Sequence, residues 1–240
     1  MGLFNVYPLY DVTPVSAKGI YVYDEDNREY LDLYGGHAVI SIGHGHPKYV
    51  KAITKQVAKL GFYSNAIQNP LQKQLANKIE KLSGCKDYQL FLCNSGAEAN
   101  ENALKLASFK TGKSRVISFK NGFHGRTSAA VAVTDNAKII APINAQQEVE
   151  ILPLGDLVAL ENALQKNDVC AVIVECIQGV GGLDESTTEF YEGIDSLCKK
   201  YGACFIADEV QSGYGRTGNF FAYQKYKVTP DIISIAKGMG

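Results

Sequence analysis

Two residues near the end of the sequence could form a catalytic pair. Asp208 ends the apolar run CFIAD, and Lys237 follows a second apolar run, DIISIA. Their separation of 29 positions is enough for one strand–crossover–strand unit, which would bring both side chains to one edge of a parallel sheet. A lone lysine is usually a solvated surface residue, and an aspartate after a strand often caps a turn. If the two side chains meet, an amine faces a carboxylate, and the pair is suited to Schiff-base chemistry.

The segment CNSGAEAN, residues 93–100, follows one predicted strand and opens a predicted helix. Ser95, Gly96 and Ala97 are small, so their backbone N–H groups can approach an anion closely at the positive end of the helix dipole. The simpler interpretation is an ordinary helix start, with Ser95 as the N-cap and Glu98 at the capping-box position. Taken alone, the segment leaves both a phosphate-binding turn and a plain cap open.

An amine, a carboxylate and a phosphate-binding turn are together what pyridoxal 5'-phosphate (PLP) requires. Lys237 would form the Schiff base, and Asp208 would keep the pyridine nitrogen protonated so that the ring can act as an electron sink. Phe123 would stack on one face of the ring and Val210 would support the other. Gln211 would hydrogen-bond the ring hydroxyl. We therefore expect a PLP site at the carboxyl ends of the strands, where ligands bind in such sheets.

Apolar runs that alternate with amphipathic helices predict the sheet itself. Strands are expected at residues 88–93, 115–119, 129–133, 170–175, 203–208 and 231–235. Helices are expected at residues 49–60, 70–82, 96–110, 157–165 and 190–201. This order is typical of an α/β fold with a mainly parallel sheet covered by helices. Near the amino terminus, residues 20–23 and 30–33 flank the turn-rich DEDNRE, which predicts a hairpin.

The composition excludes several classes of protein. The 240 residues include 24 basic and 25 acidic side chains, and 46% are hydrophobic. The chain is too apolar for intrinsic disorder, and its net charge of −1 gives no bulk attraction to nucleic acid or to a membrane surface. No apolar run approaches the ~20 residues of a membrane helix, and no leader is recognisable. Six cysteines without CxxC spacing indicate reduced thiols in a cytoplasmic protein, and no metal site is expected.

The chain resembles the class III aminotransferases, PLP enzymes of fold type I, over essentially all of its length. The segments that carry the resemblance are GHGHP, CNSGAEANENALKLA, FKNGFHGRT, VIVECIQGVGG, IADEVQSGYGRTG and PDIISIAKGMG. Each is weak alone, but their occurrence together and in order is specific. The resemblance implies the Schiff base at Lys237 and the pyridinium contact at Asp208. It also implies that Gly96 and Ala97 bind phosphate.

Within this family, FHGRT and YDVTPV look most like the acylornithine aminotransferases of arginine biosynthesis. By that resemblance Arg126 would bind the α-carboxylate of an acetyl- or succinylornithine, because a guanidinium pairs bidentately with a planar carboxylate. The alternative for Arg126 is a surface arginine in a glycine loop. Tyr10 matches a tyrosine near the substrate of related ornithine enzymes. The implied reaction moves the terminal amino group of the donor to 2-oxoglutarate, in a homodimer.

The sequence departs from the family pattern where EPxQGEGG is expected and ECIQGVGG stands. Val180 replaces a glutamate that, in related enzymes, is thought to pair with an arginine from the carboxyl-terminal half. Either Glu175 takes over that arginine on the substrate side, or the donor carries an extra carboxylate, as a succinylated ornithine does. Other class III donors (ornithine, 4-aminobutyrate or a diamine) and a non-catalytic scaffold are the alternative functions.

The family's chains are also longer than this one, so we interpret the sequence as an amino-terminal fragment. Residues 1–45 are expected to contribute to the small domain and the active site, and residues 46–240 to form a truncated large PLP-binding domain. The carboxyl-terminal small domain would be absent. We expect the fragment alone to be inactive, because apolar faces meant for the missing half would be exposed.

Overall fold

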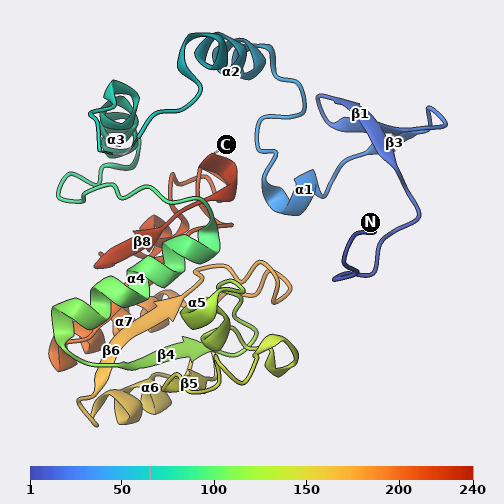
Figure 1. Ribbon diagram of the computed structural model, residues 1–240. Coiled ribbons are helices and arrows are strands. Elements are labelled where there is room, and N and C mark those ends of the chain that lie inside the picture. The colour runs from blue at the N-terminus through green and yellow to red at the C-terminus, as the bar shows by residue number, and fades with distance from the viewer. Residues whose placement is uncertain (65, 240) are drawn as a thin grey trace. The chain divides into compact units, whose positions relative to one another are not determined.

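The computed structural model describes residues 1–64 and 66–239 (Figure 1). The chain divides into two compact units, Met1–Asn69 and Pro70–Gly240. Gly240, the last letter of the segment PDIISIAKGMG, lies outside the described residues.

The first unit contains a small antiparallel sheet. Its strands are β1 (Pro14–Lys18), β2 (Tyr21–Asp24) and β3 (Glu29–Leu31), paired in the order β1-β2-β3. The hairpin predicted around DEDNRE is confirmed. Its turn is held by Asp24, whose Oδ1 accepts hydrogen bonds from the backbone N–H groups of Asp26 at 3.0 Å and Arg28 at 2.8 Å. A carboxylate bonded to its own turn in this way is a common turn device.

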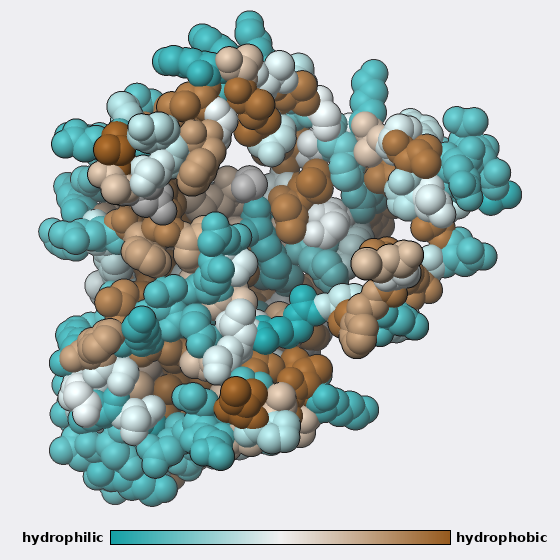
Figure 2. Space-filling view, in the orientation of Figure 1, coloured by the Kyte–Doolittle hydropathy of each residue, from teal (hydrophilic) through white to brown (hydrophobic). Residues whose placement is uncertain are grey.

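Two helices follow in the first unit, the short α1 (Gly35–Ala38) and the longer α2 (Pro47–Leu60). Pro47 occupies the start of α2, where a proline costs no helical hydrogen bond. The apolar residues of α2 repeat at the expected three- and four-residue spacing, yet the helix has no buried residue. Val50, Ile53, Val57 and Leu60 are each roughly half exposed or more. Apolar groups accordingly reach the surface in the region of α2 (Figure 2).

The second unit is built on a sheet of five strands, and its parallel arrangement is as predicted. They are β4 (Arg115–Phe119), β5 (Val149–Leu152), β6 (Val169–Val174), β7 (Cys204–Asp208) and β8 (Ile232–Ser234). The strand order is β5-β4-β6-β7-β8, and each neighbouring pair is parallel. The helices are α3 (Pro70–Ser83), α4 (Gly96–Thr111), α5 (Ser128–Ala132), α6 (Leu157–Leu164) and α7 (Thr188–Tyr201). Three short 3-10 turns complete the unit: η1 (Ala137–Ile139), η2 (Ala222–Tyr226) and η3 (Lys237–Met239).

Helices bury both faces of this sheet. Along β6, Val172 and Val174 belong to the core formed with α6 and α7, whereas Ala171 and Ile173 belong to the core formed with α4. Successive strand residues point to opposite faces, so a strand covered on both sides must be apolar throughout. All six residues of β6 are buried. Figure 1 shows α4 lying across one face of the sheet.

The predicted strand at residues 129–133 is wrong, because this segment forms helix α5. The first turn of α5 is capped from another helix. Glu101 of α4 accepts hydrogen bonds from the backbone N–H groups of Ala129 and Ala130, both at 2.9 Å, and from the hydroxyl of Thr127 at 2.9 Å. This cap satisfies the N–H groups at the start of α5. Because it comes from a residue far away in sequence, the local sequence pattern does not predict this helix.

The strand predicted at residues 88–93 is also wrong. Strand β5, which forms one edge of the observed sheet, was not predicted. Residues 89–93 pair with no strand among the described residues. A cavity separates this segment from β8, and both line it. The hydroxyl of Tyr88 donates instead to the backbone oxygen of Pro230. An apolar run becomes a strand only when a neighbour offers its backbone groups, so the run alone was insufficient.

Two simpler findings bear on the expectations from composition. In the described part of the chain, no helix combines the length and the apolar character needed to cross a bilayer. All six cysteines are free thiols. Four of them are buried (Cys170, Cys176, Cys198 and Cys204), and Cys93 is exposed.

Tyr191 of α7 provides a test of how the segment after β6 is held. Its hydroxyl donates to the backbone oxygen of Cys176 at 3.0 Å and accepts from the backbone N–H of Ser186 at 3.0 Å, and the side chain is fully buried. We expect Tyr191→Phe to lower the free energy of unfolding by about 1–3 kcal/mol, because two buried backbone groups lose their partner. The matched control is Tyr201→Phe, whose hydroxyl contacts the half-exposed Glu161 and whose loss should cost less than about 1 kcal/mol. Urea unfolding of the full-length protein measures both, and equal effects would contradict this account.

Candidate active site

The register of β7 and β8 brings Asp208 and Lys237 to the same edge of the sheet. Asp208 is the parallel partner of Ser234, and the backbone N–H of Glu209 donates to the oxygen of Ser234 at 2.9 Å. Lys237 follows three residues later, at the start of η3, and is half-buried. Burial lowers the pKa of Lys237, and the negative charges of Asp208 and Glu175 oppose this shift without cancelling it. More of this amine is therefore unprotonated at neutral pH than in an ordinary lysine.

The Asp208 carboxylate is buried and held by three hydrogen bonds. Its Oδ2 accepts from Nδ2 of Asn100 at 2.7 Å and lies 2.8 Å from Nδ1 of His124. Its Oδ1 accepts from the backbone N–H of Val210 at 3.1 Å. Only 3% of Asp208 is exposed, so these bonds replace the water that a carboxylate otherwise needs. Because a carboxylate accepts, Nδ1 of His124 carries the proton in this pair.

Two further ionisable groups lie close to Asp208. Burial by itself would lower the pKa of His124, but the hydrogen bond that His124 donates to Asp208 and the charges of Asp208 and Glu175 outweigh it, so that the pKa is raised. Burial and the charge of Asp208 raise the pKa of the Glu175 carboxyl above its usual range. Glu175 accepts hydrogen bonds from the backbone N–H groups of Phe123 at 2.9 Å and Gly179 at 3.0 Å. Glu175 thus joins the FHGRT loop to the segment after β6.

The start of α4 is both a capped helix end and a packed turn. Oγ of Ser95 accepts from the backbone N–H of Glu98 at 3.1 Å, as an N-cap should, and the Glu98 carboxylate accepts from the N–H of Asn94 at 2.6 Å. A Cβ on Gly96 would lie 2.7 Å from Cγ1 of Val210, so the helix start approaches the end of β7 closely. The first N–H groups of a helix have no partner inside it, and a cap satisfies only part of them. The cap and the anion-binding turn are therefore compatible at this helix end.

Glycines also bring the remaining loops together. Gly125 has φ +136°, and a Cβ on it would lie 2.7 Å from Cβ of Ala97, so the FHGRT loop packs on the start of α4. A Cβ on Gly179 would lie 1.6 Å from Oε1 of Gln211, which places that side chain against the segment after β6. Phe123 is half-buried in the same loop, and Arg126 is exposed.

One predicted residue belongs to the other unit. Tyr10 lies in the amino-terminal segment of the first unit and is 93% exposed. In the second unit, Lys237 lies within reach of the charges of Asp208 and Glu175, and Gly96 packs against Val210. The roles of Arg126 and Tyr10 stay predictions.

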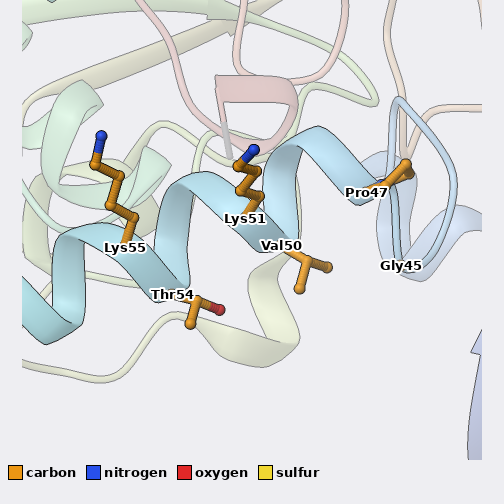
Figure 3. A pocket seen from close by; sticks show the side chains of 6 residues that line it. All are labelled: Gly45, Pro47, Val50, Lys51, Thr54 and Lys55. Carbon is orange, nitrogen blue, oxygen red and sulfur yellow. The ribbon is translucent and has the colours of Figure 1, made fainter.

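A cavity of about 740 Å³ opens beside Lys237. It is lined by residues 87–95, by one side of α4 and by residues 231–237, so Ser95 and Lys237 both reach it. A hollow in the first unit lies beside α2 and is lined by Gly45, Pro47, Val50, Lys51, Thr54 and Lys55. Figure 3 shows Lys51 and Lys55 extending from one side of α2, and Val50 and Thr54 from the other. Of the candidate residues, only Ser95 and Lys237 line the cavity beside Lys237, so the candidate site is defined by the contacts around Asp208 and not by either hollow.

Sequence reasoning missed two residues that organise this edge of the sheet. Asn100 lies one turn inside α4 and is buried. The sequence alone does not distinguish a buried asparagine from an exposed one at this position. Glu209 is fully buried, and its carboxylate accepts from the hydroxyl of Ser212 at 2.7 Å and from the backbone N–H groups of Ala222 at 2.9 Å and Tyr223 at 2.8 Å. The acidic pair at positions 208–209 was the available signal, since a second carboxylate directly after a buried strand also needs donors.

A parallel sheet with an amine, a buried carboxylate and a helix start at its carboxyl edge defines the PLP-dependent transferases of fold type I, as predicted. The family profile for aminotransferase class-III matches residues 5–240. The chain therefore belongs to the class-III aminotransferase family.

Comparison with individual proteins gives the same result. The chain is 41% identical over 239 residues to acetylornithine aminotransferase of Bacillus subtilis and 43% identical over 251 residues to that of Vibrio parahaemolyticus. It covers 62% of each relative, while 99% and 100% of this chain are matched. The chain thus spans less than two thirds of the length of these relatives.

Two solved structures are similar over nearly the whole chain. The N-acetylornithine aminotransferase of Stenotrophomonas maltophilia matches with a TM-score of 0.83 and 34% identity, over 97% of this chain and 60% of that one. The taurine:2-oxoglutarate aminotransferase of Bifidobacterium kashiwanohense, in complex with PLP and glutamate, matches with a TM-score of 0.90 and 28% identity, over 98% of this chain and 59% of that one.

The contact between Gly96 and Val210 can be tested with a double-mutant cycle. We expect Gly96→Ala to weaken PLP binding or stability by about 1–3 kcal/mol, because the new methyl group overpacks against Val210. Adding Val210→Ala should remove most of that cost, giving a coupling energy of about 1 kcal/mol or more. PLP titration and thermal unfolding of the full-length protein measure both terms. Strictly additive effects would show that the two residues do not compete for space.

The raised pKa of His124 predicts how stability varies with pH. A histidine whose folded pKa lies above its unfolded value of about 6.5 stabilises the fold fully below that value, and this contribution is lost as the pH rises through the folded pKa. We expect the free energy of unfolding of the PLP-free, full-length protein to fall over this range. His124→Asn, which cannot titrate, should make the decrease shallower. Identical slopes in urea unfolding at a series of pH values would contradict the assignment.

Proposed function

We propose that the full-length protein is a PLP-dependent aminotransferase that transfers the terminal amino group of an Nα-acylornithine to 2-oxoglutarate. The observation that carries the proposal is that Lys237, a half-buried amine, and the buried Asp208 carboxylate both follow the carboxyl ends of the neighbouring parallel strands β7 and β8, where the charge of Asp208 acts on the pKa of Lys237. The acylornithine substrate is supported by the relatives named acetylornithine aminotransferase, at 41% and 43% identity.

The residues of this sheet edge fit PLP. The start of α4 offers N–H groups to a phosphate, and Gly96 keeps that turn free of a side chain that Val210 would block. Val210 and Phe123 provide apolar contacts for the ring, and Gln211 provides an amide for its hydroxyl. When bound, the cofactor supplies an electron sink for the carbon that loses its proton.

Lys237 would serve both as the attachment point and as the group that moves the proton. An amine with a lowered pKa is unprotonated often enough to accept a proton from the substrate carbon, and the ammonium that results can return it. Asp208 would receive the pyridine N–H, since its oxygens are buried and cannot exchange that partner for water. Glu175 keeps a second negative charge near Lys237 and limits the fall of its pKa.

Substrate recognition would come from more exposed residues. Arg126 would bind the α-carboxylate of the donor, with Tyr10 on the substrate side. The buried Glu175 would contribute to the substrate side through the FHGRT loop, to which it is hydrogen-bonded. Val180, which stands in place of the family glutamate, is 65% exposed, so an additional carboxylate on the donor has room to approach this segment. We further propose a cytoplasmic homodimer in arginine biosynthesis, with residues 46–240 in the large PLP-binding domain and residues 1–45 contributing to the small domain and the active site.

The decisive experiment treats the full-length protein with PLP and then with borohydride, and locates the stable adduct by peptide mass spectrometry. We expect the adduct at Lys237, and Lys237→Ala should lower turnover by about 10²–10⁴-fold, the usual worth of a proton-transferring residue. Lys225→Ala is the matched control, because Lys225 is an exposed lysine paired with Glu185. A panel of N-acetylornithine, N-succinylornithine, ornithine and 4-aminobutyrate with 2-oxoglutarate tests the donor. Labelling elsewhere, or preference for an unacylated donor, would reject the corresponding part of the proposal.

A further inference from the structure

The hydrogen bonds around Asp208 leave it with one place for a further donor. A carboxylate has about four acceptor positions, two on each oxygen. On Oδ2, Nδ2 of Asn100 and Nδ1 of His124 occupy both positions. On Oδ1, the backbone N–H of Val210 occupies one. The position that remains is on Oδ1, and one position suits one N–H group.

The two donors on Oδ2 are themselves held firmly. Nδ2 of Asn100 also donates to the backbone oxygen of His124 at 2.7 Å, so both amide hydrogens are used on oxygen atoms and the amide orientation is defined. The backbone N–H of His124 donates to Oγ1 of Thr134 at 2.9 Å, and that hydroxyl donates to the backbone oxygen of Ala130. Asn100, His124 and Asp208 are each no more than 3% exposed. The three residues therefore form a closed, water-excluded cluster.

This cluster differs from that of the neighbouring buried carboxylate. Glu209 takes its donors from Ser212, in the loop that follows it, and from Ala222 and Tyr223 at the start of η2, all within 14 residues of it in sequence. These short-range hydrogen bonds fix the conformation of the segment between β7 and η2. Asp208 takes donors from α4 and from the FHGRT loop, both distant in sequence, and both on the same oxygen. This arrangement fills both acceptor positions of Oδ2 and leaves one on Oδ1. The Asp208 carboxylate can therefore accept a further hydrogen bond from one side only.

We propose that Asn100 and His124 are positioning residues that saturate Oδ2 of Asp208, so that Oδ1 alone receives the pyridine N–H of bound PLP. This rests on the proposed function, because it presupposes the cofactor. Asn100 and His124 would not touch the reacting atoms. They would fix the direction of the Asp208 carboxylate and so favour the protonated pyridine.

The test uses the full-length protein loaded with PLP labelled with ¹⁵N in the ring. His124→Leu and Asn100→Leu remove a donor from Oδ2, whereas His124→Asn keeps an N–H group near the position of Nδ1. We expect the leucine variants to move the pyridine ¹⁵N chemical shift toward the unprotonated value and to weaken PLP binding about tenfold or more, the worth of a hydrogen bond to a charged group. His124→Asn should stay near the wild type in both measurements.

Thermal unfolding of the PLP-free variants separates positioning from a structural role. If the leucine variants lose stability but bind PLP with normal affinity and a protonated pyridine, the positioning role is overturned. The same holds if His124→Asn behaves like His124→Leu, because restoring the donor should restore the function. If the wild type forms no borohydride-stable adduct at Lys237, the proposed function fails and this inference fails with it. An adduct in the wild type together with unchanged ¹⁵N shifts in all variants rejects this inference alone.

Discussion

A buried carboxylate must be given hydrogen bonds by the protein, and this requirement organises the carboxyl edge of the sheet. Removing a carboxylate from water costs several kcal/mol unless donors replace the water. Asp208 obtains its donors from α4, from the FHGRT loop and from the backbone after β7. Three segments that are far apart in sequence are therefore drawn to one point, and the site is assembled there.

The neighbouring charged groups follow from the same requirement. Glu175 binds the backbone of both the FHGRT loop and the segment after β6, and Glu209 binds the first backbone N–H groups of η2. Burial disfavours the charged forms of both glutamates, so their pKa values are raised, yet Asp208 and Glu175 still act on Lys237. Lys237 thus sits where desolvation favours the neutral amine and nearby carboxylates keep the shift moderate. A base that must both take and return a proton needs such a balance.

Much of this arrangement could be predicted from the sequence, because it depends on local pattern. The β-branched run of β6 and the amphipathic pattern of α7 predicted a parallel sheet. Asp208 and Lys237 were recognisable because each follows an apolar run. The predictions that were wrong or missing depend instead on contacts between residues that are distant in sequence. Helix α5 depends on Glu101, the segment at 88–93 lacks a strand partner among the described residues, and the role of Asn100 depends on a carboxylate 108 positions away. Contacts of this range leave no periodicity, so they become visible only in the structure.

The cap that Glu101 places on α5 has a consequence for local motion. The amides of Ala129 and Ala130 bond to the Glu101 side chain of α4, so they exchange with solvent only after these bonds between α4 and α5 break. The two helices should then open as one cooperative unit. His124 lies between them in sequence and bonds to Thr134 just beyond α5. Opening of the amino-terminal half of α4, where Glu101 lies, would therefore also weaken the hydrogen bond between His124 and Asp208.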